Sequence, residues 1–282
     1  MPSFFHDLAE FRFLQYSLLT AILCSVSCGV IGSFAVARRS TYIAGAIAHS
    51  VMGGLGFARY MSKVVGWEWM TPSIGAFLAA MLSSLIIIYY SLRNKERIDT
   101  VLSAIWALGM ALGITFLVAT PGYSEDLMSY LFGDILMVSH NDLLAMLGLD
   151  ALIIVIVLLT YDRLLAVSFN PQLALLKGVN VAFYEALFIL LTGFTVVLLV
   201  RIVGIILVIA LVTLPAATAG RLTQRLSRMI WYAVGFSLLY TIGGLVISYT
   251  PGLPAGPTMI ELGVLVYGIV SLLTWKKNHK RS

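Results

Sequence analysis

The sequence predicts an all-α, polytopic membrane protein with about eight or nine transmembrane helices. The chain of 282 residues is 60% hydrophobic and only 11% charged, whereas charged residues make up about 25% of a typical soluble domain. Its apolar residues fall into blocks of about 20, the length that a helix needs to cross a bilayer. The formal net charge of +5 comes from basic residues between these blocks. We therefore expect one membrane-embedded domain over residues 1–282. The excess of basic residues is not expected to bind nucleic acid.

Charged turns and turns rich in proline and glycine set the limits of the apolar blocks. Arg38 and Arg39 end the first block, and Pro121–Asn141 forms a less apolar connection whose SYLFGDIL segment predicts a short interfacial helix. The predicted membrane helices are Leu14–Ala37, Thr41–Tyr60, Thr71–Leu92, Ile98–Thr120, Asp142–Tyr161, Phe183–Val200, Val203–Gly220, Met229–Ser248 and Thr258–Trp275. Only a tight junction at Arg201 separates the sixth from the seventh, so these two could instead be one broken element.

The distribution of basic residues predicts the orientation of the chain. If all nine helices cross and Arg38 is cytoplasmic, fourteen of the eighteen Lys and Arg residues lie on the cytoplasmic side. Cytoplasmic loops of membrane proteins carry such an excess. The N-terminus is therefore expected outside and the C-terminus inside.

Two ionisable residues, His49 and Asp150, are expected near the middle of the bilayer. Each lies eight residues from the start of its predicted helix, which is about 12 Å along a helix axis. Polar residues at this depth commonly mark a transport pathway, and an imidazole with a carboxylate suits Zn²⁺ or Mn²⁺. The structural alternative is a hydrogen-bonded His49 between packed helices, with Asp150 tying helices together. Glu261, nearer the outer surface, is expected to line an entrance or cap its helix.

Small residues share one side of the helix that carries His49. Helical spacing places Gly45, Met52 and Gly56 on one stripe with the histidine, and Gly53 lies beside this stripe. This stripe can line a pathway, or it can let a second helix approach closely in lipid.

The predicted cytoplasmic loop at about 162–182 contains a short capped helix. Asn170 can cap its first turn, Pro171 suits the first helical position, and Gly178 after Lys177 suits its end. A helix of about seven residues is unstable alone in water. We expect it to dock, either on its own protein as an elbow or in a groove of a partner.

Motif searches exclude several enzyme classes. The sequence contains no HExxH zinc motif, no GxxxxGK[ST] phosphate loop and no G-x-S-x-G nucleophile elbow. Cys24 and Cys28 lie in the first apolar block and are expected to be small buried hydrophobes. We therefore expect no enzyme activity and no bound cofactor, so any energy for transport comes from another chain or an ion gradient.

Five segments in order resemble the membrane permeases of ABC importers for zinc, manganese and related metals. They are GVIGSFAVARRSTYIAGAIAHS, TPGYSEDLMSYLFGDIL, FNPQLALLKGV, RIVGIILVIALVTLPAATAGRL and PGLPAGPTMIELGVLVYGIVSLL. The resemblance implies a second permease copy, two cytoplasmic ATPase subunits and an extracytoplasmic metal-binding protein. It also implies that the helix with Asn170, Pro171, Leu173, Ala174, Lys177 and Gly178 couples the permease to the ATPase. The family's second helix carries Asp and His four residues apart as pathway ligands. Here His49 matches, but Gly45 replaces the Asp.

The sequence thus predicts the permease subunit of a bacterial ABC importer in the cytoplasmic membrane. Its expected cargo is a divalent metal ion, zinc ahead of manganese, with iron as a further candidate. His49 and Asp150 are the predicted metal contacts. The alternatives are an ABC permease for a metal chelate, a proton-coupled secondary transporter that uses these two residues as its relay, and a purely structural subunit.

Overall fold

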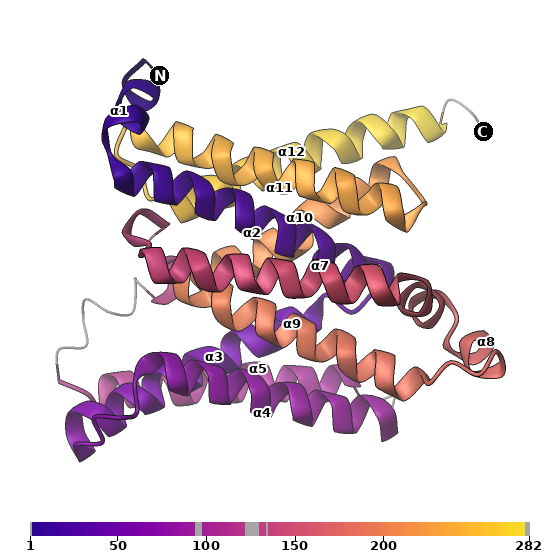
Figure 1. Ribbon diagram of the computed structural model, residues 1–282, viewed down its shortest axis with the longest axis horizontal. Coiled ribbons are helices and arrows are strands. Elements are labelled where there is room, and N and C mark those ends of the chain that lie inside the picture. The colour runs from indigo at the N-terminus through magenta and orange to yellow at the C-terminus, as the bar shows by residue number, and fades with distance from the viewer. Residues whose placement is uncertain (1, 94–97, 122–129, 134, 280–282) are drawn as a thin grey trace. The chain divides into compact units, whose positions relative to one another are not determined.

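The computed structural model describes residues 2–93, 98–121, 130–133 and 135–279, and over these ranges the chain is helical without strands (Figure 1). The α-helices are α1 (Pro2–Glu10), α2 (Arg12–Ala37), α3 (Tyr42–Tyr60), α4 (Pro72–Arg93), α5 (Ile98–Val118), α7 (His140–Phe169), α8 (Pro171–Leu176), α9 (Val181–Val203), α10 (Ile205–Leu222), α11 (Leu226–Tyr249) and α12 (Ala255–His279). A π-helical turn, η1 (Met61–Val65), follows α3, and a 3-10 turn, η4 (Ile135–Met137), precedes α7.

All nine predicted membrane helices are present, and the all-α, multi-pass membrane fold is confirmed. Among the described residues, eight helices are long and apolar enough to cross a bilayer: α2, α4, α5, α7, α9, α10, α11 and α12. Helix α3 is not in this set, since its 19 residues include His49, Ser50 and four glycines. Thirteen of those residues are buried. Protein rather than lipid surrounds most of α3, so its side chains need not be apolar.

The predicted end of the fifth membrane helix is wrong for a local reason, and the short helix predicted in SYLFGDIL is described only in part. Helix α7 continues past Tyr161 to Phe169, because nothing breaks it before Asn170 and Pro171. The connection predicted at about 162–182 is therefore largely helical. Of the SYLFGDIL segment, residues 130–132 are helical and a 3-10 turn follows; Ser129 and Asp134 lie outside the described residues.

The junction near Arg201 separates two distinct helices. Gly204 has a φ of 81° and stands between α9 and α10, a conformation that glycine adopts without steric cost. A Cβ on Gly204 would also lie 2.7 Å from the carbonyl oxygen of Leu131. Close approach and backbone conformation both require glycine here, so the chain cannot continue as one helix.

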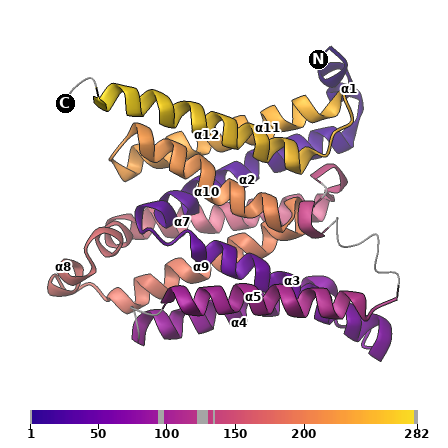
Figure 2. The same cartoon turned by 180° about the vertical axis from the view of Figure 1, so that it is seen from behind.

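Contacts divide the chain into two compact units. The first consists of Met1–Thr41, Asp134–Leu159 and Ala210–Ser282, and the second of Tyr42–Gly133 and Thr160–Ile209. Helices α1, α2, α11 and α12 belong to the first unit, whereas α3, α4, α5, α8 and α9 belong to the second (Figures 1 and 2). Helices α7 and α10 each contribute one part to both units. The prediction of a single domain over residues 1–282 stays a prediction.

Hydroxyl groups and small residues connect the helices of the first unit. The Ser25 and Thr241 hydroxyls lie 3.2 Å apart between α2 and α11, and those of Thr218 and Tyr240 lie 2.8 Å apart between α10 and α11. Gly29 packs so closely on Val234 that a Cβ would lie 2.7 Å from the Val234 nitrogen. Such close contacts and hydrogen bonds associate helices in lipid.

Helix α3 is the centre of the second unit, in contact with α4, α5 and α9. Its contacts with α4 and α5 are made by glycines. A Cβ on Gly56 would lie 2.6 Å from the Gly113 carbonyl oxygen of α5, and one on Gly54 would lie 2.6 Å from the Ala79 side chain of α4. The stripe of small residues is therefore used for close helix packing.

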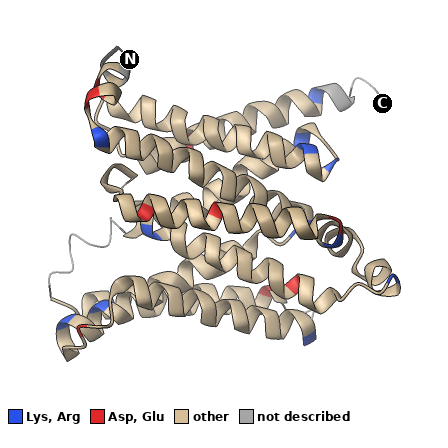
Figure 3. Ribbon diagram, viewed as in Figure 1, with Lys and Arg blue, Asp and Glu red and all other residues tan. Residues whose placement is uncertain are grey.

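The charged residues lie mostly near the ends of helices and in the turns between them (Figure 3). The long central stretches of the helices are nearly free of charge, as expected for segments in hydrocarbon. The orientation inferred from the basic residues stays a prediction.

The packing of α3 on α4 predicts that the same Gly→Ala substitution changes the free energy of unfolding differently at a packed glycine and at an open one. We expect Gly54→Ala to destabilise the protein by about 1–3 kcal/mol through overpacking. The matched change Gly148→Ala, at a helical glycine with open space around it, should be neutral or stabilise by up to about 1 kcal/mol through helix propensity. Thermal unfolding in detergent measures both; equal midpoints for the two variants would contradict the described packing.

Candidate functional site

His49 lies in the middle of α3 and is 8% exposed. Its Nδ1 atom is 2.9 Å from the carbonyl oxygen of Gly45, one turn earlier. A carbonyl oxygen can only accept, so Nδ1 carries the hydrogen in this contact. In a neutral imidazole Nε2 then keeps its lone pair, and a metal ion could bind there.

Trp106, on α5, covers one face of the His49 ring. The two ring centroids are 4.0 Å apart and the planes differ by 21°, so the rings are stacked. A Cβ on Gly45 would lie 2.7 Å from Cζ3 of the same indole. The missing side chain at position 45 thus makes room for Trp106, and the indole holds the imidazole in its orientation.

Sequence reasoning missed Trp106. The residue stands in a predicted membrane helix as one aromatic side chain among many apolar ones, with no spacing that connects it to His49. The sequence feature that could have indicated this contact is Gly109, three residues later, because glycines in membrane helices often mark close packing. In the structure, a Cβ on Gly109 would lie 2.5 Å from the His49 carbonyl oxygen. Gly109 brings the backbone of α5 against α3 at the level of the histidine.

The other stripe residues face α5. A Cβ on Gly113 would lie 2.8 Å from Met52 Cγ, and one on Gly53 would lie 3.0 Å from the Gly109 carbonyl oxygen. Met52 is fully buried in this contact. These positions form a packed helix pair in this state of the protein, and a role in a cargo pathway stays a prediction.

Asp150 lies in the part of α7 that belongs to the first unit and is 5% exposed. The hydroxyl of Ser27, on α2, donates to its Oδ1 atom. The second oxygen, Oδ2, is buried and has no hydrogen-bond partner within the part of the chain that the structure describes. An unpaired buried carboxylate oxygen is costly, so it is a candidate for a proton or a cation.

His49 and Asp150 each have a neighbour that sequence reasoning did not name: Trp106 for the histidine and Ser27 for the aspartate. The two residues belong to different compact units, and their pairing stays a prediction. Among the described residues, no group of three or more His, Cys, Asp and Glu side chains is placed to hold a metal ion. Cys24 and Cys28 are free and buried, and Glu261 is exposed on α12.

The predicted capped helix in the cytoplasmic loop is present as α8. The Asn170 side chain accepts from the Leu173 backbone N–H at 3.0 Å, Pro171 is the first helical residue, and Lys177 caps the other end. Gly178 follows with a φ of 78°. The helix has six residues, too few to be stable without contacts.

Helix α8 packs one side on its own unit and leaves leucines free on the other. Ala174 is 1% exposed, so it faces inward and cannot contact a partner directly. Leu173, Leu175 and Leu176 are 48%, 65% and 84% exposed. A leucine surface on a short capped helix is suited to insertion into a groove.

Residues 10–274 match the ABC 3 transport family. The chain belongs to this family. The manganese transport system membrane protein MntC of Halalkalibacterium halodurans is 31% identical over 97% of this chain and 91% of its own length. An uncharacterized membrane protein of Synechocystis is 36% identical over 93% of this chain and 91% of the relative. In the structure of PsaBC from Streptococcus pneumoniae in complex with Fab, one chain is similar with a TM-score of 0.82 and 30% identity, over 95% of this chain and 94% of that one.

The family confirms the resemblance inferred from the five segments, and the match covers the whole region that carries His49, Asp150 and α8. Within this ABC 3 transport protein, the replacement of the expected Asp by Gly45 has a structural counterpart. The indole of Trp106 occupies the space that a side chain at position 45 would need.

The contact between Gly45 and Trp106 predicts strong coupling of their substitutions. Gly45→Ala should destabilise the protein by about 1–3 kcal/mol because its Cβ meets the indole. In a Trp106→Leu background the same change should cost less, giving a coupling free energy of about 0.5–3 kcal/mol. Thermal unfolding of the two single variants, the double variant and the parent measures this cycle. Additive effects would show that Trp106 does not fill the space beside Gly45.

Proposed function

We propose that this protein is the membrane permease subunit of a bacterial ABC importer that moves a divalent transition metal ion into the cytoplasm. The observation that carries the proposal is the match to a named manganese transport permease over 97% of this chain and 91% of that relative. A second relative, the manganese import system permease protein ScaB of Streptococcus gordonii, is 30% identical over 99% of this chain. These names support manganese as the first candidate cargo, whereas the sequence analysis put zinc ahead of manganese.

The proposed importer needs partner chains for energy and for cargo delivery. The chain contains no GxxxxGK[ST] phosphate loop, so ATP would be hydrolysed by separate cytoplasmic ATPase subunits. An extracytoplasmic metal-binding protein would deliver the ion, and a second permease copy would complete the membrane part. Helix α8, with its exposed leucines, is the proposed docking element for the ATPase.

His49 and Asp150 are the proposed cargo contacts. The hydrogen bond from Nδ1 to the Gly45 carbonyl oxygen leaves the lone pair of Nε2 to bind a metal ion. Proteins commonly orient a ligating imidazole by such a hydrogen bond from its other ring nitrogen. Trp106 limits rotation of the ring by stacking on it. Asp150 offers the unpaired Oδ2, and carboxylate oxygen is a donor that Mn²⁺ prefers. Asp150 would supply the carboxylate contact that Gly45 lacks.

Uptake by the reconstituted complex tests the function and both contacts. Vesicles containing the permease, its ATPase and the binding protein should accumulate Mn²⁺ only with ATP. His49→Ala and Asp150→Asn should each reduce uptake at least about tenfold, the usual scale for damage to a metal site. If both residues act on the same transport step, the double variant should lose little more than either single variant.

Matched controls for these variants are His140→Ala, at an exposed position on α7, and Asp99→Asn, at an exposed position on α5; both should transport normally. Uptake driven by a proton gradient without ATP would replace the importer with a secondary transporter. Uptake of a chelate but not of the free ion would change the cargo. An active Asp150→Asn variant would remove Asp150 from the pathway and leave it as a helix-tying residue.

The docking role of α8 predicts loss of the ATPase from one charge substitution. Leu176→Asp would place a carboxylate in the docking groove, and its desolvation should weaken assembly at least about 100-fold. The control Leu253→Asp changes a leucine that is 53% exposed in the turn between α11 and α12. Co-purification and ATPase-dependent transport measure the effect. Retention of the ATPase by Leu176→Asp would show that α8 is a structural elbow only.

A further inference from the structure

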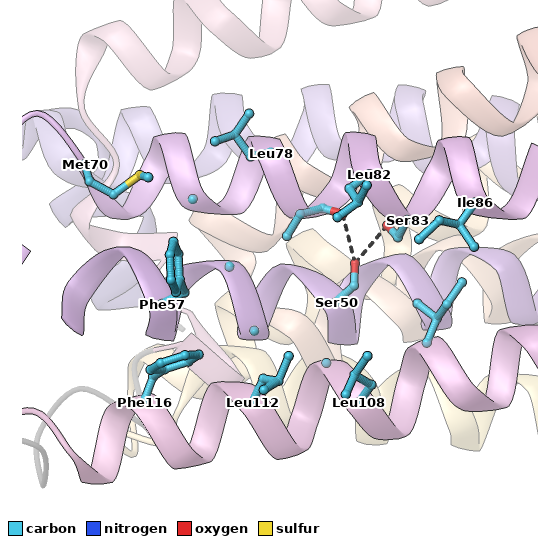
Figure 4. A pocket seen from close by; sticks show the side chains of 16 residues that line it. Ser50, Phe57, Met70, Leu78, Leu82, Ser83, Ile86, Leu108, Leu112 and Phe116 are labelled. Atoms are coloured by element: carbon cyan, nitrogen blue, oxygen red, sulfur yellow. Dashed lines mark hydrogen bonds between the residues drawn. The ribbon is translucent and has the colours of Figure 1, made fainter. Parts of the chain in front are cut away.

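Helices α4 and α5 enclose an apolar groove in the second unit, with α3 as its floor (Figure 4). Its volume is about 350 Å³. Leu78 and Leu82 of α4 face Leu108 and Leu112 of α5 across it. Ser50 and Ser83 also line it, but their hydroxyls form a hydrogen bond of 2.9 Å with each other. They also contact the backbone carbonyl oxygens of Ile47 and Ala80, at 2.7 and 3.0 Å. The groove therefore offers a ligand hydrocarbon contact and few free polar groups.

The length of the groove corresponds to one leaflet of a bilayer. Its lining on α5 runs from Ile105 to Phe116, which is about 17 Å along a helix axis. The hydrocarbon core of a bilayer is about 30 Å thick, so one leaflet is about 15 Å deep. The groove thus spans the depth over which a single lipid tail extends.

The groove has room for one extended hydrocarbon chain. Its volume is about 350 Å³, and its lining on α5 extends over about 17 Å. Leucine, isoleucine and phenylalanine side chains from both helices line it, so a lipid tail would contact hydrocarbon along its length.

One end of the groove carries the residues that lie at headgroup level in membrane proteins. Phe57, Met70 and Phe116 line this end. Trp67 and Trp69 follow η1, stack with centroids 5.8 Å apart, and are 46% and 61% exposed. Exposed tryptophans of this kind mark the membrane interface. Lys63, on η1, is exposed nearby and can contact a lipid phosphate.

We propose that the groove between α4 and α5 is a binding site for one acyl chain of a phospholipid. The tail passes over the Phe57–Phe116 pair, whose ring centroids are 5.4 Å apart, and ends near the Ser50–Ser83 hydrogen bond, with the phosphate toward Lys63. Helices α4 and α5 both contact α3 but leave the part of α3 at the base of the groove uncovered. The lipid tail would cover this part of α3. A bound tail would therefore support the helix that carries His49.

A photo-reactive phospholipid with a diazirine in the acyl chain tests the site. The probe is incorporated into nanodiscs with the full-length protein, and labelled residues are identified by mass spectrometry. We expect labelling concentrated on groove residues of α4 and α5. The changes Leu82→Trp and Leu108→Trp, at positions 62% and 61% exposed, should together lower groove labelling at least about tenfold, because each lost methylene contact weakens binding.

The matched control is Leu158→Trp on α7, a residue 73% exposed outside the groove, which should leave groove labelling unchanged. Thermal unfolding of each variant confirms that it is folded. Labelling spread evenly over all exposed leucines of the parent protein would overturn the proposal. So would efficient disulfide formation between two copies through Leu82→Cys or Leu108→Cys, since a second copy would then cover the groove.

Discussion

The second unit depends on backbone-to-backbone contact at glycines around α3. Lipid tails are as apolar as leucine side chains, so burial of apolar surface does not by itself hold helices together in a membrane. Close approach does, because it increases dispersion contacts and allows weak backbone interactions. Gly53 and Gly56 bring α5 against α3, and Gly54 and Gly75 bring in α4. The surroundings of His49, one of the two proposed cargo contacts, are built on this packing.

The same packing explains how a histidine can be held in the membrane with a defined tautomer. Contact at Gly109 places α5 against the backbone of His49, and Trp106 then lies over the imidazole one turn away. The carbonyl oxygen of Gly45 accepts a hydrogen bond from Nδ1, and the absence of a side chain at this position leaves room for the indole. Substitution of one glycine would thus change the hydrogen bond, the stacking and the helix distance together. Asp150 is arranged differently, by a single hydroxyl on a neighbouring helix.

The two proposed surfaces of the second unit differ in what they expose. Helix α8 exposes leucines on a short, capped segment between two long helices, a form suited to a protein groove. The groove between α4 and α5 is apolar and one leaflet long, a form suited to a lipid tail. Both are exposed apolar surface, but α8 lies in the connection between two long helices, whereas the groove runs along two of them.

The sequence by itself determined the local features of this protein. Apolar blocks gave the nine helices, and Asn170, Pro171 and Gly178 gave α8, because length, composition and capping act within a few residues of each other. Tertiary structure alone decided that Trp106 stacks on His49, that Ser27 binds Asp150 and that Ala174 faces inward. The first two contacts join residues 57 and 123 positions apart. Such contacts depend on which helix faces pack together, and a pattern of 3.6 residues within one helix carries no information about its neighbour.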